Sequence, residues 1–202
     1  MISKEELAGR LIHGCEAVMG AQDELTEIDS RFGDADHGIT MTKIAGAVKA
    51  AVEQSEGGIR SMLDDAATAV MMLNGGSAVP LWNTWLDGLQ EHSADGDSMS
   101  VEQVKEMFSL GCKELSALSK AKVGDKTMMD ALIPATEAME GWTGDMDGLF
   151  AAAAEAAVQG AENSRNFVSK FGRARSYGEA TIGTPDAGAV SMKYFFVGLA
   201  QK

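Results

Sequence analysis

The chain has 202 residues, of which 45% are hydrophobic and only three are proline. This length and composition allow one domain with a substantial core, and we predict a single domain over residues 1–202. Seventeen basic residues against thirty acidic ones give a formal net charge of −13, which disfavours nonspecific binding to nucleic acid and to anionic lipid. An anionic ligand would therefore need a bound metal ion or a local positive field.

The sequence shows no sign of a targeting or membrane segment. Its first ten residues include two acids and lack the apolar run of a signal peptide, and no later stretch approaches the roughly 20 apolar residues of a membrane span. We therefore expect a cytoplasmic protein that does not contact membranes. Cys15 and Cys112 lie far apart and belong to no ligand-spaced cluster, which favours two buried free thiols over a disulfide or a zinc site.

The composition, rich in Ala and Met and with 6% aromatic residues, favours helix packing over a sheet. Apolar residues recur at helical spacing over residues 4–21, after Ser3 as an N-cap with Glu6 three positions later. A second helix is predicted from about Asp36, itself a good N-cap, to the Gly57-Gly58 pair.

Six more helices are predicted further along the chain. Ser100 with Gln103 three residues later marks the start of one of them, and Pro134 lies inside another, where a kink or an early end is expected. No strand-like alternation competes with helical periodicity, so the predicted fold class is all-α with eight helices. These six predicted helices cover residues 58–73, 78–91, 100–115, 126–139, 146–168 and 187–200.

Asp29, Asp34 and Asp36 fall within eight residues, just where one apolar periodic segment ends and the next begins. Three carboxylates so close together repel one another unless a cation lies between them. Ligands that are all oxygen suit magnesium, manganese or calcium better than zinc, and magnesium keeps few protein ligands so that substrate phosphates can complete its shell. The cluster therefore indicates phosphate chemistry.

Unusual glycine and polar clusters mark four loops, at 29–38, 74–80, 121–127 and 170–188, and function commonly concentrates in such segments. These loops carry motifs in a fixed order: Gly33-Asp34-Ala35-Asp36-His37-Gly38, Gly75-Gly76-Ser77-Ala78-Val79-Pro80-Leu81, Gly124-Asp125-Lys126-Thr127-Met128-Met129-Asp130-Ala131-Leu132, and Gly172-Arg173-Ala174 with Gly178-Glu179 and Ile182-Gly183.

With these motifs, and along most of its length, the sequence resembles the nucleotide-binding L subunit of dihydroxyacetone kinase. The resemblance implies an L-type domain over residues 1–202, built as a barrel-like ring of about eight antiparallel helices with a nucleotide pocket at one end. It also implies that Asp29, Asp34 and Asp36 hold two magnesium ions, which bridge the phosphates of ADP or ATP and make these acids catalytic through the metal.

Further positions match residues that contact the nucleotide in this family. Met128 would lie against the adenine and Arg173 would reach the nucleotide, although a core methionine and a solvated arginine remain the alternatives. The first turn of the helix that begins near Asp36 would offer unpaired N–H groups to the phosphates. The matching positions are His37, Gly38, Ile39, Thr40, Gly76, Ser77, Ala78, Ser119, Met128, Arg173, Asp186, Ala187 and Gly188.

The chain departs from the family pattern in two of these loops. The family commonly has Gly-Gly-Ala-Ser-Gly-Pro-Leu, so Ser77 is displaced by one position and Val79 replaces a glycine. Ala187 stands where the family has the proline of Asp-Pro-Gly. Either Ser77 or the neighbouring backbone can make the expected contact.

Two other metal or nucleotide motifs are excluded. An EF-hand loop would require an acid at Gly38 and a glycine at Ile39. A P-loop would require a glycine five residues before Lys126 and a flanking strand, and the sequence has neither.

The function implied is that of a phosphotransferase subunit that delivers a phosphoryl group to a short ketose held by a separate K-type subunit. ADP could stay bound as a coenzyme and be rephosphorylated by an M-type phosphohistidine protein, or ATP could exchange with solvent. A kinase subunit for another ketose, such as a tetrulose, is an alternative. A nucleotide-sensing module that docks on a transcriptional regulator, without touching nucleic acid itself, is another.

Overall fold

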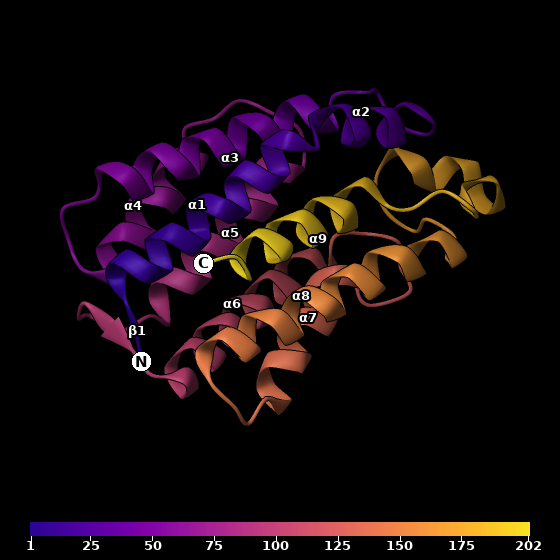
Figure 1. Ribbon diagram of the computed structural model, residues 1–202. Coiled ribbons are helices and arrows are strands. Elements are labelled where there is room, and N and C mark those ends of the chain that lie inside the picture. Colours follow the sequence, from indigo (N-terminus) through magenta and orange to yellow (C-terminus); the bar gives the residue numbers. More distant parts are fainter.

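The computed structural model describes residues 1–202 as nine α-helices, two 3₁₀ segments and two very short strands (Figure 1). The strands are β1 (Ile2–Ser3) and β2 (Ser98–Met99), and the 3₁₀ segments are η1 (Ser164–Asn166) and η2 (Arg173–Thr181). The α-helices are α1 (Lys4–Gly20), α2 (Gln22–Ser30), α3 (His37–Gln54), α4 (Ile59–Met71), α5 (Ala78–Glu91), α6 (Val101–Ser119), α7 (Met129–Gly141), α8 (Met146–Asn163) and α9 (Ala187–Leu199).

Eight of the helices form a closed ring. Each packs against the next in the order α1, α3, α4, α5, α6, α7, α8 and α9, and α9 packs against α1, while α2 lies against α3 and α9. Neighbours in the ring run antiparallel, so the N-termini of α3, α5, α7 and α9 meet at one end of the molecule (Figure 1). The predicted all-α ring of eight antiparallel helices is confirmed.

Large aromatic side chains fill the centre of the ring. Trp85 and Phe195 meet edge to face with ring centroids 5.5 Å apart, and neighbouring aromatic residues extend this contact into the hydrophobic core. Full burial of one such side chain stabilises a fold by about 1.5–3 kcal/mol. The core therefore holds the helices of the ring together. Its largest fully buried aromatic residues are Trp85, Phe108, Phe150, Phe195 and Phe196.

The end of the ring where the chain begins is closed by local hydrogen bonds. Strand β1 pairs antiparallel with β2, a two-residue ladder that the sequence pattern does not predict. Both expected capping boxes are present: Ser3 with Glu6 closes α1, and Ser100 with Gln103 closes α6. These caps satisfy N–H groups that a helix start leaves without intrahelical partners.

Helix α2 is missing from the sequence-based prediction because Leu25 is the only buried residue among its nine. A helix that buries one side chain shows little apolar periodicity. Asp29 consequently lies in the last turn of a helix and not on a loop, while Asp36 is the N-cap of α3 as expected.

Several other boundaries differ from the prediction, and α6 continues to Ser119, beyond the predicted residue 115. Helix α7 continues past Pro134 to Gly141, so it does not end early there, and the other expectation for this proline, a kink, stays a prediction. The proline cannot donate a hydrogen bond to the Asp130 carbonyl, which instead lies close to Gly160 of α8. Helix α7 begins at Met129 because Lys126 has a left-handed backbone, with φ 61°. Helix α8 ends at Asn163, before the predicted residue 168.

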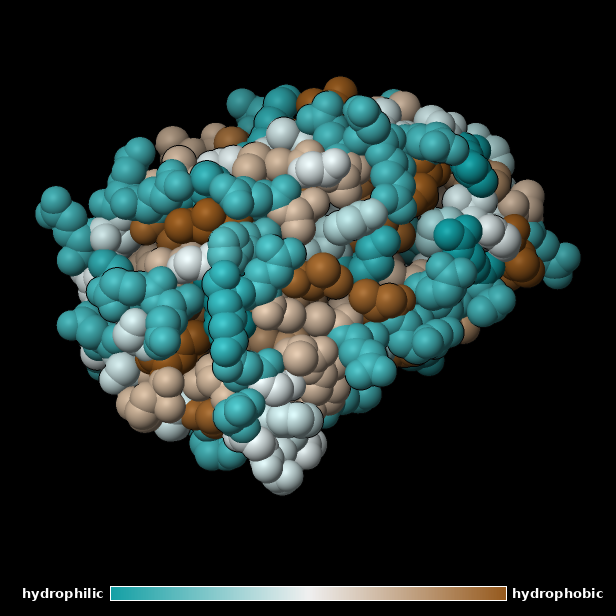
Figure 2. All heavy atoms as spheres, in the orientation of Figure 1, coloured by the Kyte–Doolittle hydropathy of each residue, from teal (hydrophilic) through white to brown (hydrophobic).

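Hydrophilic side chains dominate the face shown in Figure 2, and strongly hydrophobic groups are scattered among them. None of the helices combines the length and the apolar character needed to cross a membrane.

Both cysteines are free and buried, as predicted. Burial raises the pKa of the Cys15 thiol to about 12 and also raises the pKa of Cys112. Because the thiolate is the reactive form, we expect neither thiol of the native protein to react with Ellman's reagent at pH 8. Both should react at once in denaturant, and rapid labelling of a thiol in the native protein would contradict the packing of α1 or α6.

The closure of the ring requires a glycine at position 198. A methyl group there would come within 2.4 Å of the Gly14 Cα atom and of the His13 carbonyl oxygen. Since backbone atoms cannot move aside easily, Gly198→Ala should lower the free energy of unfolding by about 1–3 kcal/mol, measured by urea denaturation.

Gly9 provides the matched control, because no atom lies within 4 Å of a methyl group placed there. Gly9→Ala should raise the stability by about 0.5–1 kcal/mol, the usual gain inside a helix. Equal effects of the two substitutions would contradict the close approach of α1 and α9.

Candidate functional site

A cavity of about 310 Å³ opens at the end of the ring where α3, α5, α7 and α9 begin. The N-cap residues of all four helices line it. Three of these residues, Asp36, Ser77 and Met128, form no capping hydrogen bond with their own helices. Since helix N-termini combine free N–H donors with a partial positive charge, the cavity favours an anion in spite of the net charge of −13.

The three predicted metal ligands meet at the edge of this cavity. Asp29, Asp34 and Asp36 each offer a carboxylate oxygen, and these oxygens lie within 4.8 Å of one another. Oδ2 of Asp29 accepts the N–H of Asp36 at 3.1 Å, so the carboxylate at the end of α2 is tied to the start of α3. A set of three carboxylate oxygens fits a hard divalent cation such as magnesium.

The turn between α2 and α3 needs unusual backbone to bring these acids together. Ala35 has a left-handed conformation, with φ 60°, which reverses the chain between Asp34 and Asp36. At Gly33, a methyl group would lie 2.1 Å from Oδ1 of Asp29. Glycine at this position therefore leaves the space that the Asp29 carboxylate occupies.

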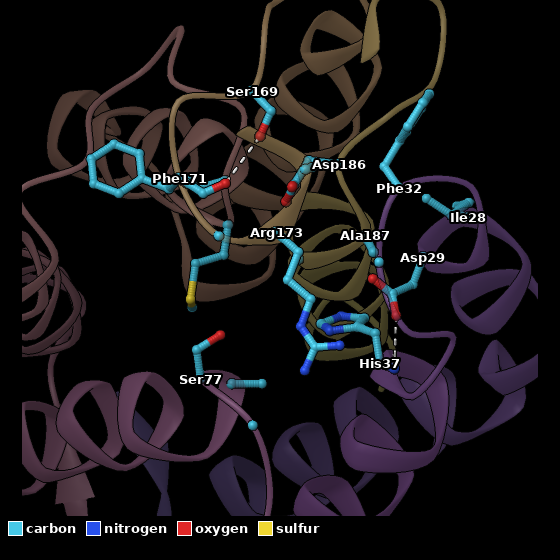
Figure 3. A pocket seen from close by; sticks show the side chains of 18 of the residues that line it. Ile28, Asp29, Phe32, His37, Ser77, Ser169, Phe171, Arg173, Asp186 and Ala187 are labelled. Atoms are coloured by element: carbon cyan, nitrogen blue, oxygen red, sulfur yellow. Dashed lines mark hydrogen bonds between the residues drawn. The ribbon is translucent and has the colours of Figure 1, made fainter. Parts of the chain in front are cut away.

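Arg173 is the cation that faces the acidic cluster. Its Nη1 atom lies 2.5 Å from Oδ2 of Asp34, although it comes from η2, far along the chain (Figure 3). Burial and the charges of Asp34 and Asp29 raise the pKa of Asp36, and Arg173 partly offsets this rise. The cluster thus holds more negative charge than one arginine neutralises.

The side chain of His37, the first residue of α3, is oriented by a contact with Ser191 of α9. The His37 Nε2 atom forms a hydrogen bond with the Ser191 hydroxyl at 2.8 Å, and the same hydroxyl lies 2.9 Å from the Ala187 carbonyl oxygen. Burial lowers the pKa of His37 despite the charge of Asp29. The imidazole is therefore neutral at neutral pH, with one ring nitrogen as a donor and the other as an acceptor.

The remaining walls come from α3 and from the starts of α5, α7 and α9. Thr40, Gly76, Ser77, Ala78 and Trp82 line the cavity. Met128 is 6% exposed and lines the cavity, so it is both a core side chain and a wall of the site. At Gly188, a methyl group would lie 3.2 Å from the Met128 amide nitrogen, so glycine lets the start of α9 pack closely against this turn.

Asp186 caps α9, where its Oδ2 atom accepts the Ala189 N–H at 2.8 Å. Burial raises its pKa to about 7, although Lys126 lowers it. Ala187 replaces the family's proline here, and the loop is fixed in another way, because the Asp186 N–H donates to the Ser164 hydroxyl at 2.9 Å.

Ten of the thirteen predicted nucleotide positions line the cavity, and Gly38, Ile39 and Ser119 do not. Gly38 is buried against α2, where a methyl group would lie 2.1 Å from the Gln22 carbonyl oxygen. Ile39 is 47% exposed. The Ser119 hydroxyl accepts the Ala121 N–H at the end of α6.

Sequence reasoning missed several residues of the cavity wall. Phe32 and Phe171 line it, and the Phe32 ring meets that of Tyr177 at a centroid distance of 5.2 Å. No periodicity marks an aromatic residue on a loop, so nothing in the sequence separates these from ordinary surface residues. Lys126 also lines the cavity. The Gly124-Asp125-Lys126-Thr127 motif that contains it was the sequence signal that could have identified it.

The DAK2 domain family matches residues 31–201. The chain belongs to this family, and the resemblance to the L subunit of dihydroxyacetone kinase is confirmed. The ADP-binding subunit DhaL of the PEP-dependent dihydroxyacetone kinase of Escherichia coli is 28% identical, and the match covers 92% of this chain and 91% of that subunit.

Longer kinases contain a similar region. The D-erythrulose kinase of Mycolicibacterium smegmatis is 36% identical over 88% of this chain but 32% of its own length, and the L-erythrulose kinase of Pectobacterium atrosepticum is 35% identical over 31% of its length. The chain thus spans about a third of these relatives. The dihydroxyacetone kinase of C. freundii, solved with AMP-PNP and Mg2+, has the same fold, with a TM-score of 0.74, 22% identity and coverage of 96% of this chain and 33% of that one.

If the three aspartates bind the metal ion, replacing one of them should weaken the metal-dependent binding of nucleotide. Asp34→Ala should weaken Mg2+-dependent ADP binding by at least about a hundredfold, as expected when a charged metal ligand is removed, while far-UV circular dichroism stays unchanged. Titration calorimetry with and without Mg2+ measures this effect. Asp64, exposed on α4 far from the cluster, is the control, and Asp64→Ala should leave the affinity unchanged. Full affinity in Asp34→Ala would refute the metal assignment.

Proposed function

We propose that this chain is the nucleotide-binding subunit of a dihydroxyacetone-type kinase, which transfers a phosphoryl group from a Mg2+-bound adenine nucleotide to a short ketose. The observation that carries the proposal is the meeting of three carboxylates with four helix N-termini around one cavity. Helix N-termini favour a polyphosphate, and acids this close to it are tolerable only with divalent cations between them. Nucleotide-dependent phosphoryl transfer depends on such positioning of the phosphates and on such neutralisation of their charge.

Asp29, Asp34 and Asp36 would hold two magnesium ions. Bound there, the ions would neutralise phosphate charge and act as Lewis acids during transfer. The ion pair between Arg173 and Asp34 places the guanidinium where it can also bind a phosphate oxygen. With the ions bound, this arrangement would add positive charge to the field of the helix N-termini.

The nucleotide would lie with its phosphates near His37, Thr40 and the start of α5, and with its base towards Met128. Gly76, Ser77 and Ala78 line that route, as do Asp186, Ala187 and Gly188 at the start of α9. Because Ser77 is the N-cap of α5 without a capping bond, its hydroxyl and the Ala78 N–H are both available to a phosphate. The Val79 N–H instead donates to the Gly76 carbonyl at 3.2 Å, and Pro80 has no N–H.

The chain contributes positioning and charge stabilisation instead of a covalent nucleophile. His37 is neutral and bonded to Ser191 on one side, which suits a residue that orients a phosphate and does not accept it. Both cysteines are buried away from the cavity. The protein's groups must therefore hold the phosphoryl donor and exclude water until the acceptor arrives.

The acceptor would be held by a separate K-type subunit. The DhaL relative from E. coli is named as part of a PEP-dependent kinase, which supports a cycle in which ADP stays bound and an M-type phosphohistidine protein rephosphorylates it. The erythrulose kinases among the relatives favour, as a second candidate, a kinase subunit acting on a tetrulose. A nucleotide sensor that docks on a transcriptional regulator would use the same cavity without transfer.

A reconstitution experiment separates these possibilities. The purified chain is combined with Mg2+, a K-type subunit and either ATP or an M-type donor, and dihydroxyacetone and erythrulose are offered in parallel. We expect ketose phosphate to form only when the chain and a K-type subunit are both present, and the preferred sugar identifies the system.

The control is the same mixture with the Asp34→Ala chain, which should form no product. ADP released on denaturing protein purified without added nucleotide would support the coenzyme cycle. Tight nucleotide binding without transfer to either sugar, with every partner and donor combination, would refute the kinase proposal in favour of the sensor.

A further inference from the structure

Residues 164–186, here called the covering segment, lie over the cavity and supply Ser169, Phe171 and Arg173 to its wall (Figure 3). None of the side chains from residue 170 to residue 180 is buried. Gly172, Gly178 and Gly183 have left-handed backbone, with φ of 62°, 55° and 92°. Apolar burial therefore contributes little to holding residues 170–180, and the conformation of the covering segment depends largely on polar contacts.

Lys126 makes such contacts at the base of the covering segment. It is 4% exposed, and its Nζ atom donates to the carbonyl oxygens of Ser164 at 2.8 Å, of Phe167 at 3.2 Å, and of Thr184. An ammonium group has three protons to donate, and here all three reach main-chain oxygens of the covering segment. These carbonyls belong to both ends of the segment, so one side chain joins the place where it leaves α8 to the place where it enters α9.

Asp125, the preceding residue, binds the same segment from its other side. Its Oδ1 atom lies 2.7 Å from the Lys170 Nζ, and its carbonyl oxygen accepts the Lys170 N–H at 3.1 Å. The carboxylate is 6% exposed whereas the Lys170 side chain is 55% exposed. The buried partner is thus on the turn before α7, and the covering segment is tied to it.

We propose that Asp125 and Lys126 are positioning residues that clamp the covering segment to the turn carrying Thr127 and Met128, and thereby fix the spacing between the adenine and phosphate ends of the cavity. The functional part of this inference rests on the proposed nucleotide site. The left-handed backbone of Lys126, uncommon in a residue with a side chain, aims its side chain across the base of the segment. The Gly124-Asp125-Lys126-Thr127 motif, which is not a P-loop, therefore has a structural role. Its lysine holds the covering segment and does not bind phosphate.

The tip of the covering segment contacts the acidic turn between α2 and α3, so the clamp at its base also affects the nucleotide site. Arg173 reaches Asp34 and Tyr177 meets Phe32, so the tip rests on the acidic turn only while the base is held. Loss of the clamp should let the tip leave the cavity, which increases the rate of nucleotide dissociation far more than it lowers the rate of association.

Lys126→Met tests the clamp, and Lys120→Met is its matched control. Lys120 has the same residue type and a similar left-handed backbone, with φ 58°, but is exposed. In Lys126→Met, we expect amide hydrogen exchange within residues 164–186 to accelerate at least about tenfold while exchange in α1 and α9 is unchanged, because only the local opening equilibrium is affected. The dissociation rate of Mg2+-ADP should rise by about tenfold or more, since a preorganised segment is lost.

Lys126→Arg should restore part of the protection, because a guanidinium also donates to several carbonyls. Lys120→Met should match the wild type in both measurements. If burial of Lys126 makes its variants unstable, Lys170→Met removes the exposed partner of Asp125 and should accelerate exchange in the same residues.

Hydrogen exchange tests whether the clamp exists, and the rate of ADP dissociation tests whether the clamp affects the nucleotide site. Unchanged exchange in the covering segment of both Lys126→Met and Lys170→Met would overturn the clamp, and so would faster exchange with an unchanged rate of ADP dissociation. If the wild type itself bound no ADP, the proposed function would fail, whereas the exchange experiment, which uses no ligand, would still decide whether the clamp exists.

Discussion

The alternation of helix direction around the ring is the constraint from which the site follows. Because eight helices close antiparallel on an aromatic core, four N-termini must converge at one end, and the N-caps of α3, α5, α7 and α9 all line one cavity. At the opposite end, Ser3, Ser100 and Asp145 cap α1, α6 and α8 with their own side chains. The four helices that begin at the cavity concentrate the partial positive charge of their N-termini there, which gives an acidic protein a place to hold an anion.

The three carboxylates of the turn between α2 and α3 oppose the positive field of the helix N-termini. They make the cavity selective for an anion that binds together with metal ions. Asp29, Asp34 and Asp36 would repel a bare polyphosphate, so the cavity should accept one only together with divalent cations. Arg173 pairs with Asp34 and belongs to a segment without a buried side chain between residues 170 and 180. Binding at this site therefore depends on rigid helix starts on one side and on a segment held by polar contacts on the other.

Much of this could be predicted from the sequence, for physical reasons. Helices with a broad apolar stripe and the two capping boxes were predictable because their signals are local, and the three aspartates were found because like charges in close sequence demand an explanation. Helix α2 was not predicted because it buries only Leu25 and so shows little apolar periodicity. The roles of Ser191 behind His37 and of Lys126 under the covering segment could not be predicted, since each depends on contacts between residues far apart in the chain. Gly38 shows a further case, because the sequence matches this position to ligand contact but does not reveal that it also packs closely against α2.

A crystal structure grown with ADP and Mn2+ in place of Mg2+ would test the metal-dependent site most directly, because anomalous scattering locates manganese without ambiguity. The result expected is manganese coordinated by carboxylate oxygens of Asp29, Asp34 and Asp36 and by the nucleotide phosphates, with the phosphates facing the N-termini of α3 and α5. Nucleotide bound elsewhere, or bound in the cavity with no manganese at the three aspartates, would contradict it.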